Sequence, residues 1–188
     1  SDYIGEKTLN NALSKYVKKV AFQEPPYTTS IDMVNHVKEV TPDSLNYLIK
    51  DMFETITLYQ NRVVETKSKK LDNGKYQVDI EFKVSKYRNN EKGRIFYGEE
   101  ERDSITYQTD DMKKPEYSVF LEDYIDVGIF GEDNDEKEIE LYLKKLKISS
   151  IHNKISIIVD QEPIEVGIDP YNKLIDTNSE DNRMKIEK

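Results

Sequence analysis

Residues 41–62, TPDSLNYLIKDMFETITLYQNR, decide the fold because the spacing of their apolar residues changes from helical to extended. Thr41 followed by Pro42 predicts a helix start, since threonine is a good N-cap and proline suits the first helical position. Apolar residues then recur every three or four positions, at Leu45, Leu48, Ile49, Met52, Phe53 and Ile56. After Ile56 the apolar period is two for most of the remaining chain. We therefore expect a helical segment followed by a β-domain.

Two further helices are predicted before this stretch. Residues 7–20 carry one apolar helical face, made of Leu9, Leu13, Tyr16, Val17 and Val20. Pro25 and Pro26 then force an extended connection. Thr29 with Asp32 three residues later is typical of a capping box and predicts a short second helix. Three short amphipathic helices have too little mutual surface to form a core of their own, so we expect their apolar faces to pack against the β-part or against another domain.

The rest of the chain predicts antiparallel strands. Residues 63–71 and 76–84 flank Asp72-Asn73-Gly74, which is typical of a tight hairpin turn. Apolar and polar residues alternate without interruption from Tyr76 to Val84. Further strands are predicted over residues 124–130, 139–143, 155–159 and 164–168, whereas residues 94–115 fit no single pattern. Six or seven short strands at this spacing predict an immunoglobulin-like β-sandwich, so the fold class is α+β with three N-terminal helices.

The predicted elements divide the chain into three parts. Residues 1–58 form the helical segment, residues 59–176 the β-sandwich, and residues 177–188 a polar tail that we expect to fray. Asp169-Pro170 ends the last strand, because proline cannot donate a hydrogen bond to a β-ladder. Tyr171, Leu174 and Ile175 are expected to pack back on the sandwich.

The charge of the chain argues against several partners. The net charge is −9 at pH 7. Residues 99–126 hold ten acids and three bases, a net charge of −7, and residues 131–138 hold five acids and one base, a net charge of −4. Nucleic acids and anionic membrane surfaces require clustered lysine and arginine, so we exclude both. Neither acidic stretch has the ligand spacing of a calcium loop, and we interpret both as solvated loops.

The sequence lacks the motifs of several common enzyme classes, and its 37 acidic residues are too many for a pair of carboxylates to indicate a site. There are no cysteines, and the two histidines, His36 and His152, are far apart and do not form an HExxH motif. The chain also lacks a glycine-rich phosphate loop and a GxSxG motif. No apolar run approaches the roughly 20 residues of a membrane span. We therefore assign no catalytic, cofactor-binding or metal-binding residue, and we expect this chain to be a soluble fragment that is not an enzyme.

Two groups of segments resemble one protein family. IGEKTLNNALSKYVKKVAF, residues 4–22, resembles the stretch that follows the catalytic centre of M1-family (gluzincin) zinc aminopeptidases, and residues 26–56 resemble the helices that close that domain. DYIDVGIFG, residues 123–131, and EPIEVGIDPYNKLIDTNSEDN, residues 162–182, are similar to the C-terminal end of bacterial proteins in which an ABC-2-type permease is fused to an M1 aminopeptidase-like domain. GIDPYNKLID, residues 167–176, is the most distinctive part.

This resemblance implies a function for the chain. The chain would be the non-catalytic C-terminal portion of a membrane-fused M1 aminopeptidase-like protein, in which the helices complete the peptidase fold and the sandwich buttresses it. The parent would lie in the bacterial inner membrane and carry zinc, its HExxH motif and a distal glutamate, none of which falls within these residues. The expected partner is the upstream peptidase domain, or a second copy that covers the helices. The residues expected to have structural or interface roles are Phe53, Gly167, Asp169, Pro170 and Tyr171.

A second class of function is also consistent with the residues. The chain could be an independent β-sandwich that binds a protein or a glycan, with some of its thirteen tyrosines as stacking surfaces. The helices distinguish the two classes, because a self-sufficient module does not need three unpartnered apolar faces.

Overall fold

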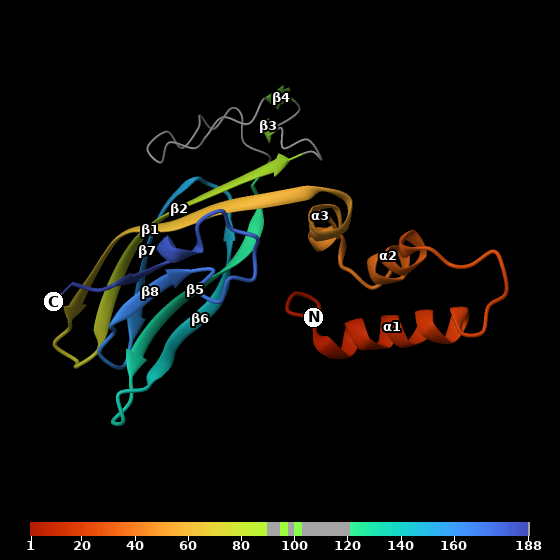
Figure 1. Ribbon diagram of the computed structural model, residues 1–188. Coiled ribbons are helices and arrows are strands. Elements are labelled where there is room, and N and C mark those ends of the chain that lie inside the picture. Colours follow the sequence, from red (N-terminus) through yellow and green to blue (C-terminus); the bar gives the residue numbers. More distant parts are fainter. Residues whose placement is uncertain (90–94, 98–99, 103–120, 188) are drawn as a thin grey trace. The chain divides into compact units, whose positions relative to one another are not determined.

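The computed structural model describes residues 1–89, 95–97, 100–102 and 121–187. The chain divides into two compact units, Ser1–Ile56 and Thr57–Lys188, which we call the helical unit and the two-sheet unit (Figure 1). Three N-terminal helices precede two antiparallel sheets that do not close into a barrel, so the α+β class is confirmed. Within the described ranges, no helix is long and apolar enough to cross a membrane.

The first two helices form where the sequence predicts them. Helix α1 spans Glu6–Val20 and α2 spans Ser30–Lys38. The predicted capping box at the start of α2 is confirmed, because the Thr29 amide donates to the Asp32 carboxylate at 2.7 Å and the Thr29 hydroxyl donates to the same oxygen at 2.8 Å. These bonds satisfy polar groups that a helix N-terminus would otherwise leave without partners.

The third helix is shorter and less regular than its apolar spacing predicts. A 3-10 turn, Asp43–Leu45, leads into α3, Asn46–Ile49, and a π-helical turn comes next at Lys50–Glu54. The predicted N-cap role of Thr41 is wrong, because its hydroxyl donates to the Val37 carbonyl at 2.8 Å, beside the C-terminus of α2. A π-turn uses more residues per turn and so rotates the later side chains about the helix axis. Consequently Leu48 and Ile49 are buried, whereas Met52, Phe53 and Ile56 are exposed.

The first sheet is built on a long hairpin. Its strands are β1 (Ile56–Lys70) and β2 (Tyr76–Asn89), and β7 (His152–Val159) pairs with β2 on the side away from β1. Short strands β3 (Ile95–Tyr97) and β4 (Glu100–Arg102) extend the same sheet. The predicted hairpin turn is present, because Gly74 has a φ of 83° and its amide donates to the Leu71 carbonyl. Ile105 and Tyr107, in the stretch that fits no single pattern, lie outside the described residues.

The second sheet has the strand order β6-β5-β8-β9. Its strands are β5 (Asp123–Glu132), β6 (Glu138–Ile148), β8 (Glu165–Ile168) and β9 (Arg183–Lys185). The expectation that the polar tail frays is wrong. A 3-10 turn, Ser179–Asp181, leads into β9, which pairs with β8, and both Asn182 and Ile186 are buried. The tail is therefore part of the sheet.

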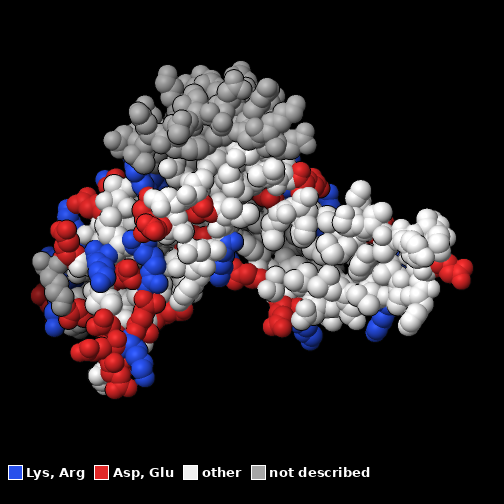
Figure 2. All heavy atoms as spheres, in the orientation of Figure 1, with Lys and Arg blue, Asp and Glu red and all other residues white. Residues whose placement is uncertain are grey.

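Alternating residues of the two sheets meet in one hydrophobic core. Val78, Phe82 and Val84 of β2 have no exposed surface, and Val127 and Ile129 of β5 are equally buried. The remaining members include Ile80, Ile125, Val166 and Ile168. On the face shown in Figure 2, acidic and basic side chains are interspersed over the two-sheet unit. The pattern of apolar-inward and polar-outward residues on β2 is the one that its sequence predicts.

Two phenylalanines test how differently the units use large apolar side chains. Phe82 is completely buried, whereas Phe53 has 45% of its surface exposed. We expect Phe82→Ala to lower the free energy of unfolding by about 3–5 kcal/mol. Phe53→Ala should cost about 1 kcal/mol or less, because roughly half of the side chain stays in water. Denaturant melts of both variants measure the difference. An equal loss for the two would show that Phe53 is packed as a core residue.

Candidate functional site

The chain covers the outer face of the second sheet with residues 169–176, which we call the covering segment. The outer face is the face opposite the shared core. On β5 it presents Asp126, Gly128 and Phe130, which alternate with core residues and are nevertheless buried. Gly128 pairs with Gly167 of β8. A Cβ atom would lie 3.1 Å from the Pro170 ring at Gly128 and 2.8 Å from it at Gly167, so this glycine pair makes room for the proline.

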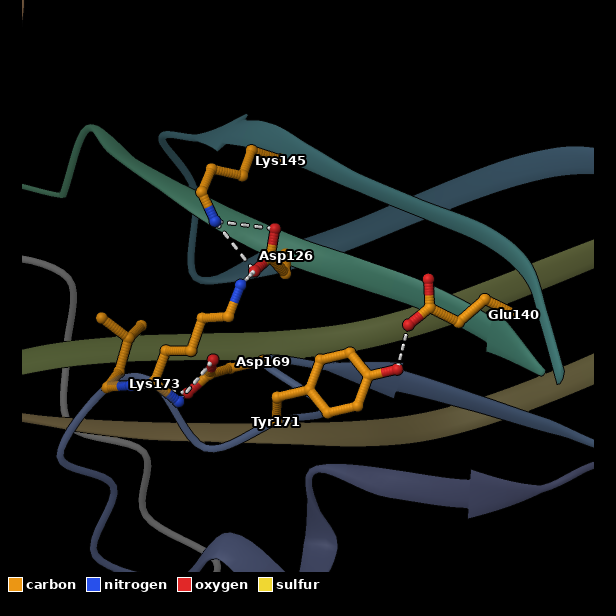
Figure 3. A network of polar contacts seen from close by, with 7 residues as sticks. Asp126, Glu140, Lys145, Asp169, Tyr171 and Lys173 are labelled. Carbon is orange, nitrogen blue, oxygen red and sulfur yellow. Dashed lines mark hydrogen bonds and ion pairs between the residues drawn. The ribbon is translucent and has the colours of Figure 1, made fainter. Parts of the chain in front are cut away.

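Asp169 fixes the turn that starts the covering segment. Its φ is 45°, in the left-handed region, and its side chain is buried. The carboxylate accepts hydrogen bonds from the amides of Lys173 at 3.0 Å and Leu174 at 2.9 Å (Figure 3). The Asp169 amide donates to the Asp126 carbonyl at 2.7 Å. One aspartate therefore closes the turn on itself and joins it to β5.

Asp126 binds two lysines from different elements. Its carboxylate contacts Nζ of Lys145 on β6 at 2.8 Å and Nζ of Lys173 in the covering segment at 2.7 Å (Figure 3). Only 6% of the Asp126 side chain is exposed. A carboxylate this buried is costly unless it is paired, and the two ammonium groups compensate for its lost hydration. The network thus connects β5, β6 and the covering segment.

Aromatic and basic side chains continue the cover toward the end of β5. The Tyr171 hydroxyl donates to Glu140 (Figure 3). The Tyr171 ring packs edge-on against Phe130, with 6.1 Å between the ring centres. The bond to Glu140, followed by burial, raises the pKa of Tyr171 to about 12. The Arg183 guanidinium lies 4.2 Å from the Phe130 ring centre and binds Glu138 and Glu165. These contacts close the outer face over Phe130.

The end of the covering segment reaches the first sheet. Asp176 forms an isolated bridge with Tyr59, and its carboxylate accepts the Asn61 amide at 2.8 Å. The side-chain amide of Asn182 satisfies its neighbours when its nitrogen faces Asn61 and Asp176. In this orientation the nitrogen donates to the Asn61 carbonyl at 2.8 Å and to the Asp176 carboxylate at 3.3 Å. The segment therefore connects β1 with the turn before β9, although the two belong to different sheets.

A second buried ion pair lies between the two sheets. Nζ of Lys86 on β2 contacts Asp123 on β5 at 2.9 Å, and each side chain is 3% exposed. The Tyr59 hydroxyl donates to the same carboxylate at 3.2 Å. Strands β1 and β2 thus each contribute a side chain that binds Asp123 of β5. We interpret this buried ion pair as structural.

The first sheet has an open depression of about 440 Å³ on its outer face. Glu65, Lys67, Glu81 and Lys154 line much of it. Lys154 pairs with Glu81 at 2.7 Å and Lys67 pairs with Glu65 at 2.5 Å, so these charges compensate one another within the sheet. The depression therefore presents a mixed-charge surface.

The structure brings together only some of the residues that the sequence singled out. Gly167, Asp169, Pro170 and Tyr171 meet on the outer face of β5 and β8, whereas Phe53 belongs to the helical unit. Leu174 packs against the core as expected, but Ile175 is 69% exposed. Sequence reasoning missed the charged side chains that complete this network, which are Asp126, Glu140, Lys145, Lys173 and Arg183.

The two histidines lie in different units. His36 contacts the Asp32 carbonyl through Nδ1 and the Tyr16 ring edge-on, and His152 begins β7. Among the described residues, no group of three or more potential ligands could hold a metal ion. What the arrangement does chemically is to neutralise buried charges and fix the covering segment. No family model and no curated protein matches this chain.

Asp169 and Asp133 form a matched pair for testing the covering segment. Each carboxylate accepts two backbone amides, but Asp169 is buried and Asp133 sits in the exposed turn between β5 and β6. We expect Asp169→Ala to lower the free energy of unfolding by about 2–3 kcal/mol, because it leaves buried amides without partners. Asp133→Ala should cost less than half as much, since water replaces the lost acceptor. Denaturant melts compare the variants, and equal losses would contradict the proposed role of Asp169.

The pKa of Asp169 supplies a second test. Burial raises the pKa of Asp169 above its ordinary value of 3.8 and outweighs the two amide hydrogen bonds, which lower it. The negative charges of Asp126 and Asp176 raise the pKa further. Protonation therefore favours the folded state, so this contribution to stability is complete below pH 3.8 and is lost as the pH rises through the folded-state pKa. Carbon-13 NMR titration should place the Asp169 midpoint above 3.8 and that of exposed Asp32, whose pKa its bonds to Thr29 lower, below 3.8. The reverse order would contradict this assignment.

Proposed function

We propose that this chain is the non-catalytic C-terminal portion of a membrane-fused M1 zinc aminopeptidase-like protein. In this proposal the helical unit completes the peptidase fold and the two-sheet unit, an immunoglobulin-like sandwich, buttresses it. The sequence resemblance supplies the family. The exposed apolar side chains of the helical unit are the structural observation that carries the proposal.

The helical unit leaves several of its large apolar residues exposed to water. Phe22 is fully exposed, and more than half of the surface is exposed for Val17, Tyr27, Ile31 and Met52. The buried apolar residues of this unit are only Ala12, Val37, Leu48 and Ile49. Few charged side chains interrupt the face of the helices that Figure 2 shows. A surface of this kind is typical of a protein interface, and a peptidase domain with a complementary apolar face would cover it.

The two-sheet unit supports the buttressing role by its rigidity. The carboxylates of Asp126, Asp169 and Asp176 are all occupied by bonds within the unit. Such saturated networks hold strands in fixed positions and leave few polar groups for a substrate. This supports a structural part for the unit beside a catalytic domain that contributes zinc and its ligands.

An independent binding module is the second candidate. The observation that favours it is that the two-sheet unit has its own core and is compact without the helical unit. A module of this kind would bind a protein or glycan through its own surface, and the mixed-charge depression on the first sheet is the concave surface it offers.

The two candidates differ in which exposed isoleucine matters. Ile31 in α2 is 68% exposed and Ile175 in the two-sheet unit is 69% exposed, so they are matched in residue type and exposure. We expect the coding sequence upstream of Ser1 to carry HExxH and a distal glutamate, and the encoded domain to bind this chain in calorimetry. Ile31→Glu should weaken this binding by about tenfold or more, and Ile175→Glu should not.

Two results would contradict the proposal. One is an upstream sequence without a zinc-peptidase motif. The other is binding that depends on Ile175 and not on Ile31. A second copy of the chain that covers the helices would appear as self-association that Ile31→Glu abolishes, and it would count against the peptidase domain as the partner.

A further inference from the structure

Among the described residues, strand β7 lies at an edge of the first sheet. It pairs with β2 along its whole length, in a register that sets Ile80 opposite Ile155 and Tyr76 opposite Val159. No other strand of the described residues pairs with β7. The Val84 amide donates to the Ile151 carbonyl at 2.9 Å, which fixes the alternation of the ladder. The odd-numbered residues of β7 therefore bond to β2, and the amides and carbonyls of Lys154, Ser156 and Ile158 point to the free edge.

Beyond Lys154, the free edge of β7 carries none of the charges that usually protect edge strands. Edge strands of soluble proteins are commonly guarded by lysines and other charges. Strand β6, the edge of the second sheet, obeys this rule with Lys144, Lys145 and Lys147. In contrast, residues 155–159 of β7 read ISIIV without a charge, and Ile158 is 57% exposed. A segment of this composition with an open backbone edge is suited to adding another strand.

We propose that a second copy of this chain adds its β7 to this edge in antiparallel orientation. The two-fold axis passes through Ile157, so each contact occurs twice. In this register Ser156 lies opposite Ile158 of the second copy, and these even-numbered residues supply the backbone hydrogen bonds between the copies. On the core side Ile155 meets Val159 of the second copy and the two Ile157 side chains meet each other.

Charge complementarity selects both the occupant and the register. Lys154 lies opposite Asp160 of the second copy, twice, at the two ends of the paired stretch. Asp160 comes directly after the last residue of β7. Within its own copy Lys154 pairs with Glu81 and Asp160 pairs with Lys75, but the side chains of Lys154 and Asp160 are 77% and 80% exposed and so accessible to a second partner. A register centred on Lys154 would instead oppose two lysines, and one centred on Ile155 would leave Lys154 opposite Ser156. Of these three registers, the one centred on Ile157 combines an uninterrupted apolar row with opposite charges at both ends.

The test uses the full chain and reverses one charge. Asp160→Lys replaces two attractive contacts between copies by two repulsive ones, which should weaken self-association in sedimentation equilibrium by about tenfold. Lys154→Glu combined with Asp160→Lys restores opposite charges and should restore association. Asp135→Lys is the matched control, because Asp135 is 78% exposed beside Lys137 as Asp160 is exposed beside Lys75. The control should associate like the unmodified chain.

Hydrogen exchange gives a readout that is independent of charge. The amides of Ser156 and Ile158 should become protected as the protein concentration rises, whereas those of Ile155 and Ile157 should be protected at every concentration by β2. A chain that stays monomeric at the highest attainable concentration would overturn the proposal. So would self-association that Asp160→Lys leaves unchanged, which would place the contact elsewhere, for example on the helices. This inference does not depend on the proposed function.

Discussion

The two-sheet unit depends on the burial of β5 on both faces. One face of this strand contributes Ile125, Val127 and Ile129 to the core, and the other lies under the covering segment. A strand in this position has no solvent face on which to place polar groups. Its outer residues are therefore Gly128, Phe130 with its ring against Arg183, and Asp126 with its carboxylate bound to two lysines. Every element that surrounds β5 supplies one of these partners.

This arrangement explains why buried charges occur in so small a unit. Asp123 and Asp126 each bind a lysine from another strand. Such pairs add little net stability, but removal of one partner leaves a buried charge and costs about 3–5 kcal/mol. The energetic consequence is specificity of pairing, because a shift of β5 by one residue would place Asp126 in the core and move Asp123 away from Lys86. The pairs thus favour one register of β5 against β2 and β6.

Local signals predicted the capping box of α2, the hairpin and the alternation of β2, because each depends on residues close in sequence. The network on β5 was not predictable in this way. Asp126 and Lys173 are 47 positions apart, and nothing near either residue indicates the other. The polar tail was misjudged for the same reason, since β9 gains its stability from pairing with β8 and not from its own composition. The π-turn after α3 also overrode a regular apolar spacing.

The two units differ in the kind of chemical group that they expose to a partner. The helical unit exposes apolar side chains, whose burial is favourable against any complementary apolar surface and therefore selects a partner by shape. The free edge of β7 exposes backbone amides and carbonyls, which require another extended chain at a defined spacing. These requirements cannot be met by the same surface. The two proposals therefore assign different kinds of partner to the helical unit and to β7.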